Sequence, residues 1–155
     1  MQLGAPRDVG GLTAAFEANA RLANMRFTRH EWDVYEYRYE FSIDVPEFNE
    51  TRDVAVFWSP LRPLNPITHM PGQACRRHRN IDQYRSLCLW YPEDPPERRW
   101  SLDGGLQELR DLTIVHAFCE ACCSRGEKWH KPEAPRPHRR PEGCRACPEN
   151  WRSCP

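Results

Sequence analysis

With 155 residues, 22 basic and 22 acidic side chains and a formal net charge of zero, the chain is expected to fold as one domain with a substantial core. The balanced charge argues against a general affinity for nucleic acid or for anionic membranes, and no apolar run approaches the roughly 18 residues that cross a bilayer. Because the N-terminal stretch also lacks the basic start and apolar centre of a signal peptide, we expect a cytoplasmic protein without a membrane partner.

The first predicted elements are a helix and a group of strands. Residues 11–25 are rich in alanine and place apolar side chains at helical spacing. Residues 31–45 alternate large apolar and mostly polar side chains, which predicts one long strand with five large groups on a buried face. These five are Tyr35, Tyr37, Tyr39, Phe41 and Ile43. Residues 53–58 (DVAVFW) carry apolar side chains on both faces, as expected of a central strand, and a short strand is expected at 67–70.

The second half of the chain begins with an irregular segment and continues with a helix. Ser101 is a candidate helix cap, apolar side chains follow it at helical spacing as far as Arg125, and Gly126 is a natural stop. Prolines then exclude long regular elements. The order predicts an α+β fold, with an N-terminal helix, an antiparallel β-meander, an active-site segment and a C-terminal helix. Residues 1–128 would form this domain, and residues 129–155 a Pro/Cys/Arg-rich extension.

Residues 78–100 contain the strongest candidate for chemistry. Cys88 lies in a short apolar run, and Asn80 precedes it by eight residues. Cysteine is an effective nucleophile in acyl transfer, and an asparagine amide can donate a hydrogen bond to the oxyanion that forms. The basic side chains just before Asn80 are either a solvated surface cluster or, if they lie near Cys88, a cause of a lowered thiol pKa. The alternative reading is that Cys88 is a buried structural cysteine.

This segment resembles the active site of ubiquitin-conjugating enzymes. A His-Arg-Asn triplet at residues 78–80 stands where the family has His-Pro-Asn, Cys88 follows at the family's spacing, and a Trp-Ser pair at residues 100–101 matches the start of the next helix. Arg79 replaces the family's proline, and Arg85 stands where a glycine is common. Glu120 lies near the position of an acidic gating residue found in eukaryotic members.

One subgroup is more similar still. Residues 86–92 and 126–138 look like bacterial conjugating-enzyme-like proteins that are associated with CBASS, an antiphage defence built on cyclic-oligonucleotide cyclases. The resemblance implies a UBC-like fold and a cysteine acyltransferase without a catalytic cofactor. Cys88 would carry a thioester, Asn80 would stabilise the oxyanion and His78 would hold the loop. The acyl donor would be the C-terminus of a cyclase or ubiquitin-like protein, and the acceptor an amine on another protein.

Two Cys-x-x-Cys pairs make a second constellation. Four thiolates in such pairs can hold a tetrahedral zinc ion, although the 21 residues between the pairs slightly exceed the commonest spacing. The predicted structural zinc ligands are Cys119, Cys122, Cys144 and Cys147. Cys123, His130, His138 and Cys154 are alternative ligands. The other interpretation is that the first pair packs the helix and binds no metal.

A different class of function also fits the C-terminal part of the sequence. The tail is mildly basic, carries Trp151 and follows Trp129. A zinc-stabilised module that binds nucleic acid or protein without catalysis is therefore the alternative to the enzyme. The excess of about four positive charges is small for a nucleic-acid-binding tail, so a nucleic-acid partner is the less expected of the two.

Overall fold

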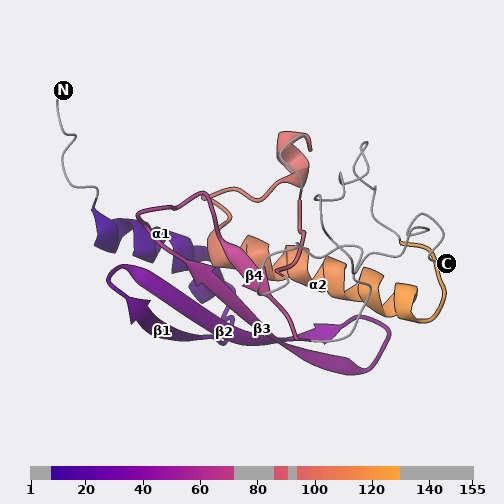
Figure 1. The fold of residues 1–155 in the computed structure, drawn as a ribbon. Helices are drawn as coiled ribbons and strands as arrows, with labels where there is room; N and C mark the ends of the chain where they lie inside the picture. The colour runs from indigo at the N-terminus through magenta and orange to yellow at the C-terminus, as the bar shows by residue number, and fades with distance from the viewer. Residues whose placement is uncertain (1–7, 72–85, 91–93, 130–155) are drawn as a thin grey trace, which may run out of the picture.

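The computed structural model describes residues 8–71, 86–90 and 94–129. Four strands form one antiparallel sheet in the order β1-β2-β3-β4, and two helices lie against one face of it (Figure 1). The elements are α1 (Val9–Leu22), β1 (Thr28–Asp33), β2 (Glu36–Val45), β3 (Glu50–Trp58), β4 (Ile67–His69), the short 3₁₀ turn η2 (Pro96–Arg98) and α2 (Gly105–Ser124). The predicted α+β class and element order are confirmed. Residues 130–155 of the predicted extension lie outside the described residues.

Helix α1 begins two residues before the predicted start. The carboxylate of Asp8 accepts a hydrogen bond from the backbone N–H of Gly11 at 3.0 Å, which caps the first turn. Phe16 and Ala20 are fully buried, as their helical spacing predicts. Phe16 stacks on Trp58 of β3 with ring centroids 4.2 Å apart, so the helix is fixed against the middle of the sheet.

The predicted long strand at residues 31–45 is wrong in one respect, because two strands and a tight turn occupy the region. Val34 and Tyr35 form the turn between β1 and β2. The Asp33 carboxylate accepts the Val34 N–H at 2.7 Å, and Tyr35 has φ +59° in the left-handed region. Tyr35 is consequently exposed, while Tyr39, with the alternate residues after it in β2, is buried as predicted.

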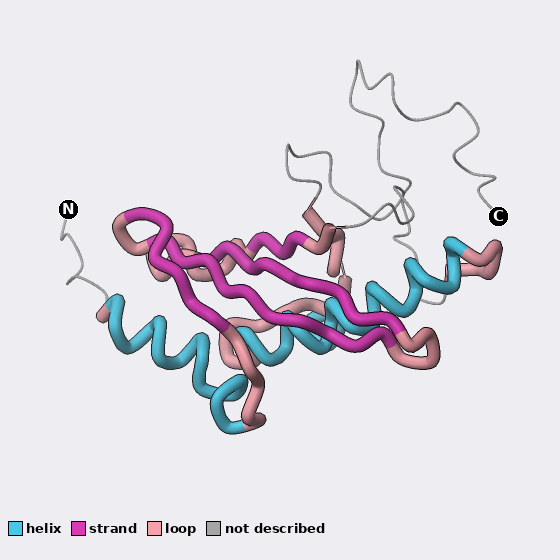
Figure 2. Tube along the Cα trace, turned by 90° about the horizontal axis from the view of Figure 1, so that it is seen from below, coloured by secondary structure: helices cyan, strands magenta, loops and turns pink. Residues whose placement is uncertain are grey.

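Strand β3 is an interior strand, as its apolar sequence predicts. It pairs with β2 along its whole length and with β4 at its C-terminal end. The tip of the β2–β3 hairpin reaches the C-terminal half of α2 (Figure 2). There Phe48 packs edge-on against Phe118, with centroids 5.7 Å apart. The hydrophobic core therefore lies between the helices and the inner face of the meander.

Helix α2 begins at Gly105, four residues after the predicted cap. Ser101 and Glu108 instead bond to each other, since the Glu108 carboxylate accepts from both the N–H and the hydroxyl of Ser101. Gly105 has φ +56°, and a Cβ there would lie 2.4 Å from the Phe16 carbonyl oxygen. A glycine is required here because the turn passes so close to α1. The C-terminal stop at Gly126 is as predicted.

No helix in the described part of the chain is both long and apolar enough to cross a membrane.

Candidate active site

The segment that carries Cys88 lies along the outer edge of β4. The backbone N–H of Leu87 donates to the carbonyl of Thr68 at 2.8 Å. Leu87 and Leu89 are each 5% exposed and belong to the core, whereas Cys88 between them is half-buried. Two buried leucines therefore hold the backbone and leave the intervening thiol on the other side, as alternation along an extended chain requires.

The Cys88 thiol makes a contact within its own stretch. Its Sγ donates to the carbonyl oxygen of Trp90 at 3.9 Å, a weak interaction for an S–H group. Only Leu87 in this segment forms a bridge to the sheet, and the remaining four described residues have no regular secondary structure. Cys88 is therefore partly exposed on a stretch with little regular secondary structure, and reactive cysteines are typically partly exposed.

Two stacked indoles connect this segment to the core. Trp90 and Trp100 have ring centroids 6.1 Å apart and an interplanar angle of 28°. The Trp100 indole N–H donates to the carbonyl of Gly105 at 2.9 Å, and its ring meets Phe16 edge-on. Trp100 is thus fixed by both helices, and it holds Trp90, two residues beyond Cys88, in place. Trp100, which the sequence singled out as part of the Trp-Ser pair, therefore joins the two helices to Trp90.

The upstream part of the predicted site lies outside the described residues. His78 and Asn80, with the rest of residues 72–85, have no described position. The oxyanion role of Asn80 and the loop-holding role of His78 stay predictions. Among the residues that were predicted to be catalytic, the structure describes Cys88.

Glu120 of α2 is fully buried, so it has no exposed position from which to gate an active site. Its carboxylate accepts a hydrogen bond from Arg52 of β3 at 3.0 Å. His116, also fully buried, lies one helical turn away with its Nε2 3.3 Å from the same carboxylate. Trp129 meets the His116 ring edge-on at 5.1 Å. Glu120 is therefore part of a buried network that joins α2 to the sheet, and such pairs are structural when both charges are satisfied.

The first predicted zinc pair lies in the core. Cys119 and Cys122 are 1% and 2% exposed and share one face of α2, because three residues make about one helical turn. Burial, with the carboxylate of Glu127 as a second cause, raises the pKa of the Cys122 thiol. Zinc requires thiolates, so a metal would have to overcome this preference for the neutral form.

The partners of that pair, Cys144 and Cys147, lie outside the described residues. Among residues 8–71, 86–90 and 94–129, no group of three or more His, Cys, Asp or Glu side chains is placed to hold a metal. The zinc site stays a prediction, as do its alternative ligands in the tail.

Two buried carboxylates, Glu17 and Glu120, were not anticipated from the sequence. Each is at most 2% exposed and each binds arginine from another element. Their only sequence signal is that each lies on the apolar face of its helix, where a charged residue needs a partner.

Comparisons of the chain with protein-family models, with curated proteins and with solved structures give no match.

Proposed function

We propose that this protein is a thioester-forming acyl carrier of the ubiquitin-conjugating type, with Cys88 as its nucleophile. Cys88 receives the C-terminal carboxyl group of a donor protein and transfers it to an amine. The observation that carries the proposal is the contrast around the thiol: Leu87 and Leu89 are buried core residues, whereas Cys88 between them is only partly buried. The buried neighbours anchor the backbone at Cys88, and an acyl donor would reach the thiol through its exposed part.

The proposed chemistry has two balanced steps. The Cys88 thiolate attacks the carbonyl carbon of an activated carboxyl group, a thioester or acyl adenylate made by a separate activating protein. The C–S bond forms, and the activating group leaves with its electron pair. An amine then attacks the Cys88 thioester, the C–N bond forms, the thiolate leaves, and the amine proton passes to water. Asn80 would donate to the oxyanion in both steps, a contribution of about 10²–10³ in rate for such donors.

The cellular setting follows from the resemblance of the active-site segment. The donor would be the C-terminus of a cyclic-oligonucleotide cyclase or of a ubiquitin-like protein, the acceptor an amine-bearing protein, and the process antiphage defence in the bacterial cytoplasm. The contact of Trp90 with Trp100, and that of Trp100 with Gly105, support this proposal because they anchor Trp90 two residues after Cys88. Such preorganisation favours attack on a carbonyl that a partner protein presents.

The proposal can be tested without knowing the natural donor. The full chain is incubated with a peptide ending in Gly-Gly that has been converted to a small-molecule thioester, and adducts are located by intact and peptide-level mass spectrometry. We expect one adduct on Cys88 that thiols and hydroxylamine remove. Cys88→Ala should abolish the adduct, and Cys88→Ser should give an ester that thiols do not remove.

Cys123 provides a matched control, since it is a half-buried cysteine on regular helix α2. Cys123→Ala should load Cys88 as efficiently as the unchanged protein. An adduct that persists in Cys88→Ala, or that Cys123→Ala removes, would show that another thiol is the nucleophile and would overturn the proposal.

A further inference from the structure

Three arginines surround the turn that joins α1 to β1. We name Arg21, Arg26 and Arg29 the arginine corner. Asn24, with φ 54° in the left-handed region, reverses the chain between the helix and the strand. Arg21 is in the last turn of α1, Arg26 is in the connection, and Arg29 is the second residue of β1. The three side chains line a concavity of about 610 Å³.

Two of these guanidinium groups, those of Arg21 and Arg29, are held in place by one buried carboxylate. The buried carboxylate of Glu17 accepts from Nε and Nη2 of Arg21 through one oxygen, and from Nη1 of Arg29 at 2.7 Å through the other. Tyr39 donates its hydroxyl to the same carboxylate. Arg21 also lies over the ring of Phe27, 5.4 Å from its centroid. A single buried anion therefore orients two cations that retain further N–H donors.

Burial alone would raise the pKa of Glu17, but its hydrogen bonds from Arg21 and Arg29 and the charge of Arg29 outweigh burial and hold the pKa below the ordinary value. Glu17 therefore stays ionised and neutralises one of the three guanidinium charges. The C-terminal end of a helix such as α1 contributes about half a negative charge more. A clear positive excess remains at the corner of a chain that is neutral overall.

The positive excess is accessible. The side chains of Arg21 and Arg29 are 64% and 43% exposed. Arg26 makes no ion pair with any residue that the structure describes, and none of the described residues lining the 610 Å³ concavity is acidic. Arg21 and Arg29 bind Glu17 on their buried side. On the side that faces the concavity, no carboxylate of the described residues lines it, so guanidinium N–H donors face solvent there.

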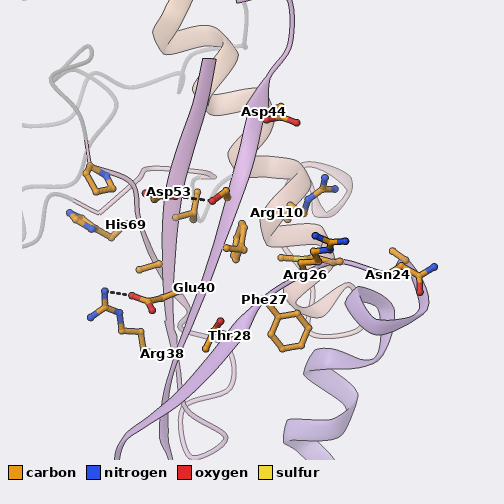
Figure 3. Close-up of a pocket in the computed structure, with 17 residues that line it drawn as sticks. Asn24, Arg26, Phe27, Thr28, Arg38, Glu40, Asp44, Asp53, His69 and Arg110 are labelled. Atoms are coloured by element: carbon orange, nitrogen blue, oxygen red, sulfur yellow. Dashed lines mark hydrogen bonds and ion pairs between the residues drawn. The ribbon is translucent and has the colours of Figure 1, made fainter. Parts of the chain in front are cut away.

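A second concavity, of about 1040 Å³, adjoins the corner and shares its turn (Figure 3). Arg110 of α2 lines it on the same side as Arg26 (Figure 3). The carboxylates of this larger hollow belong to the strands; one of them, Glu40, is paired with Arg38. Arg26 and Arg110 thus lie on one side of this hollow, and the third arginine that lines it, Arg38, lies on the strands with Glu40.

We propose that the arginine corner binds the phosphoryl group of a small ligand such as pyrophosphate or a nucleotide. One guanidinium satisfies both oxygens of a carboxylate in a bidentate pair. Three guanidinium groups that approach from a helix, a turn and a strand instead match a tetrahedral anion with more oxygens and more than one negative charge. The concavity has room for such a group. This site is separate from Cys88 and goes beyond the acyl-carrier function.

The test is calorimetric titration of the full chain with inorganic pyrophosphate, and with ATP in a second arm, at constant ionic strength in a phosphate-free buffer. We expect one site per chain in both arms. Arg26→Gln should weaken binding by about 10- to 100-fold, the range for losing a hydrogen bond to a charged group. Because the Arg26 side chain is exposed and unpaired within the described chain, the variant should retain the melting temperature of the unchanged protein.

Arg62→Gln is the matched control, since it removes one charge from an arginine that is 70% exposed and pairs with Glu36 away from the corner. It should leave pyrophosphate affinity within a factor of two. The proposal is overturned if millimolar pyrophosphate gives no binding, if the two variants weaken binding equally, or if only long single-stranded DNA binds, which would indicate a polyelectrolyte surface. Peptide loading of Cys88, measured without phosphate, remains an independent readout of the acyl-carrier function.

Discussion

Cys88 and the pair Cys119 and Cys122 show how differently one side chain can be used in a small protein. Cys88 lies in the described stretch 86–90, which meets the sheet through one backbone bridge at Leu87, and its thiol is partly exposed. Cys119 and Cys122 lie on the inner face of a 20-residue helix and are almost completely buried. We expect the first setting to leave the thiol reactive, whereas the second uses the thiol for packing.

The contrast shows that backbone regularity and exposure separate the cysteines better than their number or spacing does. A Cys-x-x-Cys pattern is the most conspicuous feature of the sequence, yet on α2 it places two thiols in the core, where burial raises the pKa of Cys122. Cys88 belongs to no such motif. It differs from the helical cysteines because its side chain is partly exposed while those of Leu87 and Leu89 are buried.

The largest expected effect is on thiol reactivity. We expect iodoacetamide under native conditions to modify Cys88 about 10³-fold faster than Cys119 or Cys122, because buried helical groups react only through unfolding openings of several kcal/mol. Time-resolved alkylation followed by peptide mass spectrometry gives the rate at each cysteine. In denaturant the rates should converge. If the native alkylation rates of the three cysteines lay within tenfold of one another, the claim that α2 protects Cys119 and Cys122 would be wrong.

A second experiment removes a buried contact of α2, the helix that carries Cys119 and Cys122. Glu120→Ala removes the carboxylate that buried His116 shares with Arg52, while Arg52 keeps its second partner Glu50. Losing one partner of a buried ion pair costs up to about 3–5 kcal/mol. Urea unfolding should show this loss, and alkylation of Cys119 and Cys122 should accelerate with it. Asp111→Ala, on the exposed side of the same helix, should change stability by about 0.5 kcal/mol or less. Equal effects of the two variants would mean that the buried network is not a stabilising contact.

The smallest expected effect concerns pH. Burial raises the pKa of Cys122 above its ordinary value of 9.0, so the unfolded chain loses this proton at lower pH than the folded chain. The stability that the neutral thiol contributes is full below about pH 9 and is lost as pH rises through the folded pKa. The unfolding free energy of the unchanged protein should therefore fall more steeply above pH 9 than that of Cys122→Ala. Parallel curves across this range would contradict the buried position of Cys122.

Local patterns in the sequence predicted much of the fold. The alternation from Tyr37 to Ile43 predicted the inner face of β2, and the apolar run at residues 53–58 predicted the interior strand. The turn at Val34 and Tyr35 was missed because neither is a usual turn residue; the side chain of Asp33 makes the turn instead. The delayed start of α2 depends on how closely Gly105 approaches Phe16, which is a tertiary contact.

The candidate site also combines features that a sequence can and cannot predict. Cys88 could be singled out from local spacing, and its catalytic role stays a prediction. The ion pairs could not: Glu120 binds Arg52, 68 residues away, and Glu17 binds Arg29 and Tyr39 from different strands. A single sequence indicates that a carboxylate on an apolar helix face needs a cation, but it does not indicate which cation the fold will supply.

The stacked pair of Trp90 and Trp100 gives this protein an intrinsic spectroscopic reporter. Two indole rings whose centroids are 6.1 Å apart couple their electronic transitions, and such coupling produces a paired positive and negative band in ultraviolet circular dichroism. The signal depends on the mutual orientation of the two rings and therefore on the position of Trp90, two residues after Cys88. Any event at Cys88 that moves Trp90 should change this band, and the change can be recorded on the unlabelled protein.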